Sequence, residues 1–147
     1  MKLDIIIDPT SEEKITAVVH AEGKLTDALR RLAEKDNTLE TLTVYNERDV
    51  KRLPLSEVEC LSVRDGRCMA VDANGESFRV KETLSELEER LPQGFIRINK
   101  SAIANEKRVE RFCATIGGGV DAVFLSGYRE YVSRRCFAEI KRRFSEK

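Results

Sequence analysis

Basic and small polar side chains stand where short apolar segments give way to loops. They are Arg64, Arg67, Asn99, Lys100, Ser133, Arg134 and Arg135. Arginine can hold a phosphate or a guanine edge through two parallel hydrogen bonds, and lysine or asparagine can reach base edges and phosphate oxygens. Loops at strand ends often carry function, because a rigid scaffold exposes them. These residue types therefore point to recognition of a phosphate-bearing polymer.

The charge of the chain is balanced overall but unevenly distributed. Among 147 residues, 26 are basic and 26 are acidic. From Phe95 onward there are 12 basic and 6 acidic residues, whereas the 94 residues before Phe95 hold 14 basic and 20 acidic ones. A polyanion is attracted by local positive potential rather than by the net charge of the whole protein. The C-terminal part of the chain is therefore the part expected to meet such a partner.

Three segments of this C-terminal part follow a recognisable order. They are FIRINKSAIAN (Phe95 to Asn105), VERF (Val109 to Phe112) and YVSRR (Tyr131 to Arg135). In order and spacing they resemble a LytTR-type DNA-binding domain, over about Leu42 to Phe144. The chain departs from the family pattern at Ala102, where a bulky residue is common, and at the triple glycine 117–119, which lengthens a hairpin.

The resemblance implies a transcriptional regulator that reads double-stranded DNA through loops rather than through a recognition helix. It places base-contacting positions at Arg67, Lys100 and Arg135, with Arg64 and Arg134 as alternates one alignment step away. Asn99 and Ser133 accompany them, and the backbone amides that begin the helix after Ser133 could hold a phosphate. Ser101 and Asn105 are interpreted as turn and capping residues, since short polar side chains bond local backbone.

The spacing of apolar residues predicts a mostly β protein with helices, of the α+β class. Short strands recur at regular intervals, separated by turn signals such as Asp65-Gly66 and Asn74-Gly75. The strands are expected at 41–45, 50–53, 58–63, 68–71, 77–80, 96–98, 109–115, 120–125 and 129–132. Thr83 and Ser133 are expected to cap two helices. The resemblance adds an elongated stack of small antiparallel sheets with flanking helices.

The first 38 residues have a different pattern from residues 39–147. Leu3 to Ile7 and Ile15 to Ala21 are typical of strands, and Thr26 to Asp36 of an amphipathic helix. This strand–strand–helix appendage is too short for a receiver domain. Two roles remain open for it: dimerisation, or docking onto a separate sensor such as a membrane protein.

Other function classes find little support in the sequence. The only histidine is His20, and Cys60, Cys68, Cys113 and Cys136 form no CxxC pair, so neither a hydrolase triad nor a metal site is predicted. We expect no enzyme activity, no cofactor, no metal and no small-molecule substrate. Cysteines with ordinary buried or half-buried thiols are expected, with a redox role for Cys136 beside Arg135 as the alternative.

The N-terminus has no signal-peptide pattern, and no apolar run is long enough to span a membrane, so a cytoplasmic protein is expected. On DNA, two copies are expected on repeated sites about one helical turn, ~10 bp, apart, which makes the chain a homodimer at least on DNA. Two alternatives stay open. One is a protein-interaction module or anti-activator that keeps the fold without binding DNA. The other is RNA binding, for which only Tyr128 and Tyr131 offer aromatic rings near the basic loops.

Overall fold

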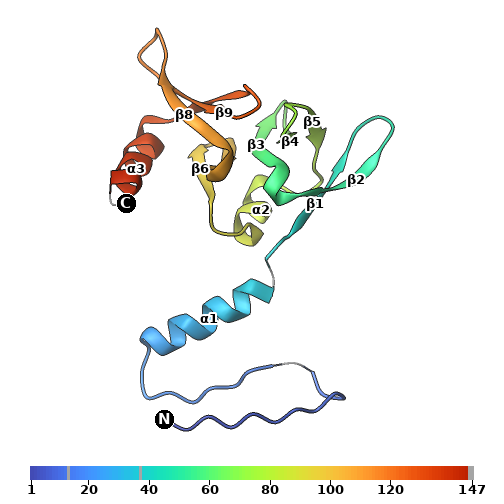
Figure 1. Cartoon of the computed structure of the whole chain (residues 1–147), viewed down its shortest axis with the longest axis vertical. Coiled ribbons are helices and arrows are strands. Elements are labelled where there is room, and N and C mark those ends of the chain that lie inside the picture. Colours follow the sequence, from blue (N-terminus) through green and yellow to red (C-terminus); the bar gives the residue numbers. More distant parts are fainter. Residues whose placement is uncertain (13, 37, 146–147) are drawn as a thin grey trace. The chain divides into compact units, whose positions relative to one another are not determined.

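The computed structural model describes residues 1–12, 14–36 and 38–145, and the chain divides into two compact units. The first unit is Met1–Glu34, and the second begins at Lys35. Helix α1 (Lys24–Asp36) accounts for the regular structure of the first unit (Figure 1). It confirms the helix predicted from Thr26, and its first turn is closed by the Thr26 hydroxyl, which accepts from the Gly23 amide at 2.9 Å.

The two strands predicted at the N-terminus are wrong for this structure. Neither Leu3 to Ile7 nor Ile15 to Ala21 joins a ladder, and the first strand in the described part of the chain begins at Thr41. The side chains of both runs are exposed. The apolar pattern favours strands, but a strand exists only when a neighbour satisfies its backbone hydrogen bonds.

The second unit consists of antiparallel strands with two further helices. Its strands are β1 (Thr41–Tyr45), β2 (Val50–Pro54), β3 (Val58–Arg64), β4 (Arg67–Asp72), β5 (Ser77–Arg79), β6 (Phe95–Asn99), β7 (Ala102–Asn105), β8 (Val109–Ala114), β9 (Val120–Phe124) and β10 (Arg129–Val132). Its helices are α2 (Leu84–Arg90) and α3 (Arg134–Ser145). One sheet has the order β2-β1-β5-β4-β3-β7-β6, and the other has the order β10-β9-β8. The predicted α+β class is confirmed.

Turns and caps behave as the local sequence predicts. Asp65 and Gly66 have φ angles of 51° and 75°, the left-handed values that a tight two-residue hairpin requires. The Thr83 hydroxyl accepts from the Glu86 amide at 3.2 Å and begins α2. The Ser133 hydroxyl accepts from the Cys136 amide at 3.2 Å and begins α3. These local signals fix where strands and helices start.

Strand β7 is absent from the strands expected from sequence. It pairs with β3 on one side and β6 on the other, and all four of its residues are buried. The Asn105 side chain at its end accepts from the Lys107 amide at 3.2 Å, as expected of a cap. It also donates to the Val58 carbonyl at 2.9 Å, which joins β7 to β3.

The larger sheet has an apolar cluster on each face. On one face, α2 covers a cluster that includes Leu42, Leu61 and Leu87. On the other face, the three-stranded sheet and α3 contribute Phe124, Val132 and Ile140 to a second cluster. Successive residues of β3 belong to opposite clusters, Cys60 to the second and Leu61 to the first. The second cluster therefore fixes α3 against the larger sheet.

A buried carboxylate ties the two sheets together. Glu59 on β3 is 0% exposed and accepts from Arg108 Nη2 at 3.1 Å and Nε at 3.3 Å. The same carboxylate accepts from the Ser126 amide at 3.2 Å and from the Ser126 hydroxyl. Arg108 immediately precedes β8, and Ser126 lies in the turn between β9 and β10. Glu59 therefore links strand β3 of the larger sheet to one end of the three-stranded sheet, where the start of β8 lies beside the β9–β10 turn.

The four cysteines are free thiols, as expected. Cys60 and Cys68 are buried, whereas Cys113 and Cys136 are partly exposed. Burial raises the pKa of Cys60 strongly, and burial, followed by the nearby Glu82 charge, raises the pKa of Cys68 to about 11. Their thiolate forms are therefore scarce at neutral pH.

The rates at which the four thiols are alkylated should reflect these differences in exposure and pKa. At pH 8 a thiol with a pKa of about 11 is ionised in roughly one molecule per thousand, against about a quarter for an ordinary thiol. Cys113 and Cys136 should therefore react with iodoacetamide first, and Cys60 and Cys68 only after unfolding. Peptide mass spectrometry over a time course measures this. Early labelling of Cys60 in the folded protein would show that the clusters around β3 open readily.

Candidate nucleic-acid interface

Three turns of the second unit are joined by short hydrogen bonds. The Val63 amide near the end of β3 donates to the Ser101 carbonyl in the β6–β7 turn at 2.8 Å. The Ser133 amide, which precedes α3, donates to the Ile98 carbonyl on β6 at 2.8 Å. The Asn99 side-chain amide donates to the Tyr131 carbonyl on β10 at 2.6 Å. The β3–β4 turn, the β6–β7 turn and the start of α3 therefore lie together.

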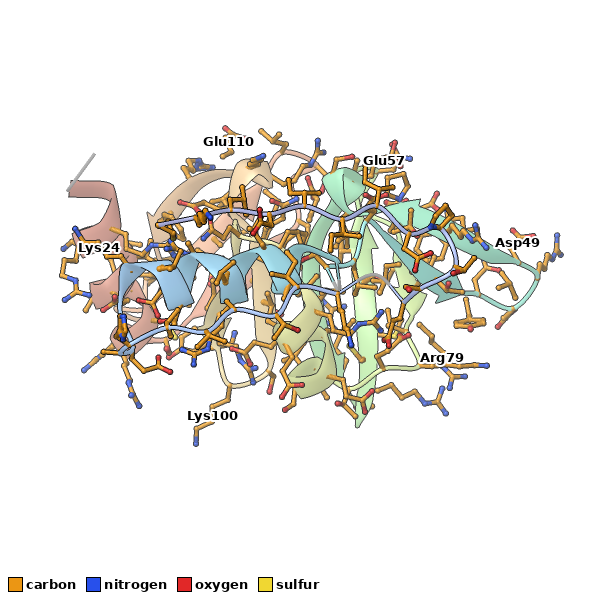
Figure 2. The ribbon with its side chains drawn as sticks, turned by 90° about the horizontal axis from the view of Figure 1, so that it is seen from below. Lys24, Asp49, Glu57, Arg79, Lys100 and Glu110 are labelled. Atoms are coloured by element: carbon orange, nitrogen blue, oxygen red, sulfur yellow. The ribbon has the colours of Figure 1, made fainter. Side chains whose placement is uncertain are left out.

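We use the term basic edge for the polar residues carried by these three turns: Arg64, Arg67, Asn99, Lys100, Ser133, Arg134 and Arg135. An open depression of about 460 Å³ lies between the turns, and Arg64, Asn99, Lys100 and Ser133 line it. Figure 2 shows the Lys100 side chain extending outward from the tip of its hairpin. The structure thus brings together side chains that are up to 69 positions apart in the sequence.

Four cations of the basic edge are available for an external partner. Arg67, Lys100, Arg134 and Arg135 are exposed, and no side-chain hydrogen bond or ion pair is found for them within residues 1–12, 14–36 and 38–145. Other arginines of the second unit are paired, such as Arg108 with Glu59 and Arg129 with Asp121 at 3.3 Å. Cations without internal partners keep their full capacity to bind phosphate or base edges.

Arg64 is held in place by an aromatic ring. Its Nη2 donates to the Tyr128 hydroxyl, and its guanidinium lies 5.3 Å from the centre of the Tyr128 ring. Burial raises the pKa of Tyr128, so the phenol stays neutral and stacks as an uncharged ring. A stacked guanidinium loses less freedom on binding than a mobile one, because its orientation is already fixed.

Asn99 has a structural task as well as a place in the depression. Its side chain donates to Tyr131 and accepts from the Ser101 amide at 2.7 Å, so both ends of the amide are used. Sequence reasoning left Arg97 out of the site residues, although it braces the same turn. Its guanidinium donates to the carbonyls of Asn99, at 2.9 Å, and Lys100, and it pairs with Glu88 at 2.7 Å. Both residues therefore shape the turn that presents Lys100.

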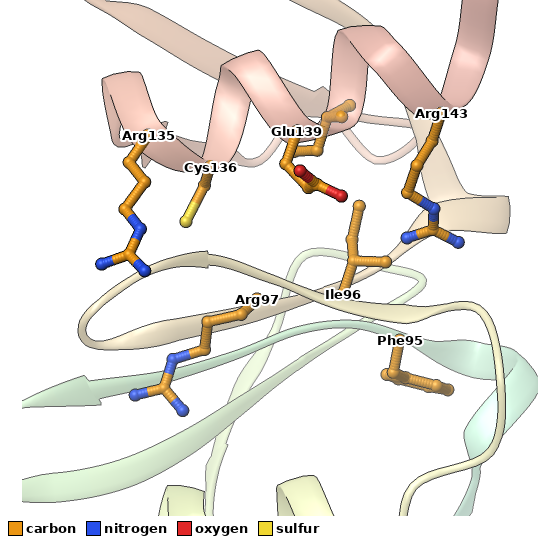
Figure 3. Close-up of a pocket in the computed structure, with 8 residues that line it drawn as sticks. Phe95, Ile96, Arg97, Arg135, Cys136, Glu139 and Arg143 are labelled. Atoms are coloured by element: carbon orange, nitrogen blue, oxygen red, sulfur yellow. The ribbon is translucent and has the colours of Figure 1, made fainter. Parts of the chain in front are cut away.

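Arg135 faces a separate pocket between α3 and β6. This pocket measures about 500 Å³, and its lining includes Arg97, Cys136, Glu139 and Arg143. The guanidinium groups of Arg97 and Arg135 lie at the same end of it, and Arg143 lies at the other end (Figure 3). The basic edge therefore continues from the central depression along the first turn of α3.

Arg67 lies on the opposite flank, in a depression of about 360 Å³. Arg79 and Lys81 line the same depression and were missed from the sequence. The signal that could have indicated them is their spacing: Arg79 ends β5, Lys81 follows two residues later, and residues two apart share one face of an extended segment. Together the three residues extend the positive surface beyond the β3–β4 turn.

Each of the three depressions also has an acidic residue in its lining, namely Glu130, Glu139 or Glu82. Glu130 lines the central depression, and its carboxylate accepts from the Tyr131 amide at 3.2 Å. Tyr131 lines the depression too, and 52% of its surface is exposed. A carboxylate repels phosphate but accepts from the amino group of cytosine, so this position favours a base edge over backbone.

The described residues contain neither a cluster of metal ligands nor a helix that could span a membrane. Within the described residues, no group of three or more His, Cys, Asp and Glu side chains could hold a metal ion. Of the helices in the described part of the chain, none has the length and apolarity to span a bilayer.

Comparisons with known proteins agree with this geometry. The family model of the LytTr DNA-binding domain matches residues 48–145. Uncharacterized HTH-type transcriptional regulators of Staphylococcus aureus strains NCTC 8325 and COL are each 31% identical over 148 residues, covering 99% of both chains. A solved LytTr DNA-binding domain from Bacillus cereus superposes with a TM-score of 0.64 at 21% identity, covering 71% of this chain and 95% of that one. The chain belongs to the LytTR family of DNA-binding transcriptional regulators.

Proposed function

We propose that this protein is a sequence-specific regulator that reads double-stranded DNA through the basic edge. The proposal rests on one observation: three adjoining turns carry four exposed cations that have no internal partner among the described residues, namely Arg67, Lys100, Arg134 and Arg135. Phosphate contacts from such turns fix the register of a protein on DNA, and base contacts in the grooves give sequence preference. In this proposal residues 39–147 bind DNA, and the cytoplasm, where chromosomal DNA lies in bacteria, is the site of action.

The arrangement of helices favours reading by turns. A helix-turn-helix places two consecutive helices against each other, with the second in the major groove. In this chain α2 and α3 are separated by β6, β7, β8, β9 and β10. The Ile140 side of α3 is buried against the second cluster, whereas Arg134 and Arg135 in its first turn are exposed. The first turn of α3 can therefore approach phosphate with its amides and with Arg134 and Arg135.

The proposal also includes the binding of two copies of the protein to a repeated DNA site. A single basic edge spans few base pairs, and dimers commonly read two half-sites about one helical turn, ~10 bp, apart. Selection from random duplex DNA should therefore enrich a repeated motif. An unrepeated motif would contradict the two-copy arrangement but leave DNA binding intact.

Single alanine substitutions test the individual contacts. Lys100→Ala and Arg135→Ala should each weaken binding to the selected site by about 1–3 kcal/mol if the side chain reads a base. Fluorescence anisotropy with the selected duplex and with a scrambled duplex measures the loss. Arg48→Ala is the matched control, because Arg48 is an exposed cation in the hairpin between β1 and β2. Unchanged affinity in either variant would remove that residue from the interface.

The dependence on salt separates DNA binding from the main alternative. Binding through several phosphates should weaken with a log–log slope of roughly −0.9 per contact. A module that keeps the fold but binds a protein partner should show neither enrichment nor this slope. The proposal fails if selection enriches nothing and affinity for duplex DNA is weak at low salt.

A further inference from the structure

The first unit has no core of its own. Every described side chain in residues 1–12 and 14–33 is exposed or half-buried. Seven large apolar residues here are at least 74% exposed, namely Met1, Leu3, Ile5, Ile6, Ile7, Ile15 and Val18. Soluble proteins rarely leave so many apolar side chains in water, and segments below about 40 residues seldom fold without help. This unit therefore needs a covering partner.

The polarity of residues 2–8 alternates with the period of a strand. Leu3, Ile5 and Ile7 fall on one face, while Lys2, Asp4, Ile6 and Asp8 fall on the other. Pro9 follows directly and cannot donate to a ladder, so a strand here ends at Asp8. Figure 1 shows this segment as a coil without a paired neighbour. The Asp8 carbonyl accepts from the Ser11 amide at 3.3 Å, and within the described residues no partner is found for the backbone groups of residues 2–7, which leaves them and the apolar face available for a second strand.

We propose that residues 2–8 pair antiparallel with the same residues of a second copy of this chain, around a two-fold axis at Ile5. This register places Leu3 opposite Ile7 and Lys2 opposite Asp8, and symmetry produces each contact twice. Opposite charges facing each other across antiparallel strands are stabilising, whereas like charges there are destabilising. Hydrogen bonds from Ser11 and Thr10 hold the pKa of Asp8 at about 2, so this carboxylate is charged at neutral pH.

The second apolar run is self-complementary in the same way. An antiparallel register centred on Val18 places Lys14 opposite Glu22, whose carboxylate also binds Arg30 of its own chain at 2.6 Å, and Ile15 opposite Ala21. In each run, a lysine of one copy faces a carboxylate of the other copy. An isologous contact between identical chains requires such self-complementarity. A different protein as partner would need no such self-matching. The occupant that the charge pattern favours is therefore a second copy.

Helix α1 supplies the apolar surface to cover the paired strands. Leu25, Leu29 and Leu32 follow helical spacing, and Leu25 and Leu32 are 43% and 53% exposed. A helix of 13 residues is only marginally stable alone, and its stability in proteins comes from packing of such a face. Two copies together provide strands from both chains and two helices, which suffice for a small two-layer core.

The test is the mass of the full chain in solution without DNA. Sedimentation equilibrium should give twice 16.7 kDa at micromolar concentration. Ile5→Lys should give the monomer, because it places two lysines against each other on the axis. Ile6→Lys is the matched control, since the proposed register places residue 6 opposite Asp4, and this variant should remain dimeric. A monomeric parent, or equal loss in both variants, overturns the proposal.

The charge pair gives an independent measurement. Lys2→Glu should raise the dissociation constant of the dimer about tenfold, and adding Asp8→Lys to it should restore the parent value. Hydrogen exchange should show protected amides within 3–7 in the parent and in Ile6→Lys but not in Ile5→Lys. A dimer without this protection would show that pairing occurs elsewhere. DNA binding by the basic edge does not enter any of these readouts, so the two proposals can fail separately.

Discussion

Glu59→Ala is expected to lower the free energy of unfolding by about 3–5 kcal/mol, the usual result of breaking a buried ion pair. The substitution leaves the Arg108 guanidinium, 23% exposed, without its carboxylate. It also removes the acceptor for the Ser126 amide and hydroxyl. Urea unfolding followed by circular dichroism measures the change. Because Glu59 joins the two sheets, the dependence of the unfolding free energy on urea concentration is informative as well. An unchanged slope means that both sheets still unfold together, and a smaller slope means that they unfold separately.

Two controls isolate the contribution of the buried carboxylate. Glu57→Ala removes an exposed carboxylate two residues earlier and should change the free energy by no more than about 0.5 kcal/mol. Glu59→Gln keeps an acceptor of similar shape without the charge. Its change in the free energy of unfolding should lie between those of Glu59→Ala and Glu57→Ala. If Glu59→Ala unfolds at the same urea concentration as the parent, the link between the sheets is not what stabilises the second unit.

Local sequence signals were sufficient for most of the second unit. The strands were predicted because β-branched and apolar residues alternate between turn dipeptides such as Asp65-Gly66, whose backbone requirement is purely local. Thr83 and Ser133 marked helix starts for the same reason, since a cap needs only residues within one turn. In these cases the folded environment agrees with what the nearest neighbours already favour.

Strand β7 shows where local signals fail. Ala102 and Ala104 are poor strand formers by composition, yet both are fully buried between β3 and β6. Small side chains suit this position because Ala102 and Ala104 belong to the cluster beneath the three-stranded sheet and α3. The strand is therefore determined by packing against elements that are distant in the sequence. A short window of adjacent residues carries no information about that packing.

The opposite failure occurs at the N-terminus. Leu3 to Ile7 has the composition and alternation of a strand, but it forms no ladder with any part of the chain that the structure describes. The proposed pairing with a second copy would reconcile pattern and structure. In that case the prediction from sequence describes the dimer, whereas the structure of one chain shows the unpaired segment.

The composition of the basic edge was predictable, but its assembly was not. Positive charge at Lys100 and Arg135 is visible in the sequence. The contact between their turns depends on the order β3-β7-β6 and on hydrogen bonds such as Ser133 to Ile98, which join residues 35 positions apart. The internal partners that distinguish Arg64 and Arg97 from the unpaired cations are equally non-local. Only the family resemblance anticipated that these loops face one way.

Reversing two charges of the basic edge should abolish specific binding. Lys100→Glu combined with Arg135→Glu removes two contacts, each expected to contribute about 1–3 kcal/mol, and adds repulsion from phosphate. The combined loss should be at least about 4 kcal/mol, roughly a thousandfold in the dissociation constant. Both side chains are exposed and have no internal partners in the described structure. The free energy of unfolding should therefore change by no more than about 0.5 kcal/mol. Anisotropy titration at ~0.15 M salt measures the binding.

The matched control makes the same change in net charge at the opposite edge of the larger sheet. Arg48→Glu combined with Arg52→Glu alters exposed cations on the β1–β2 hairpin, whereas Lys100 follows β6 at the other edge. Charges further apart than about 8 Å are largely screened at physiological salt, so this variant should lose little affinity. Equal losses in the two double variants would mean that DNA responds to total charge, and the basic edge would then not be the reading surface. A large loss confined to Lys100 and Arg135 would locate recognition at the turns, because only local contact distinguishes variants of identical charge.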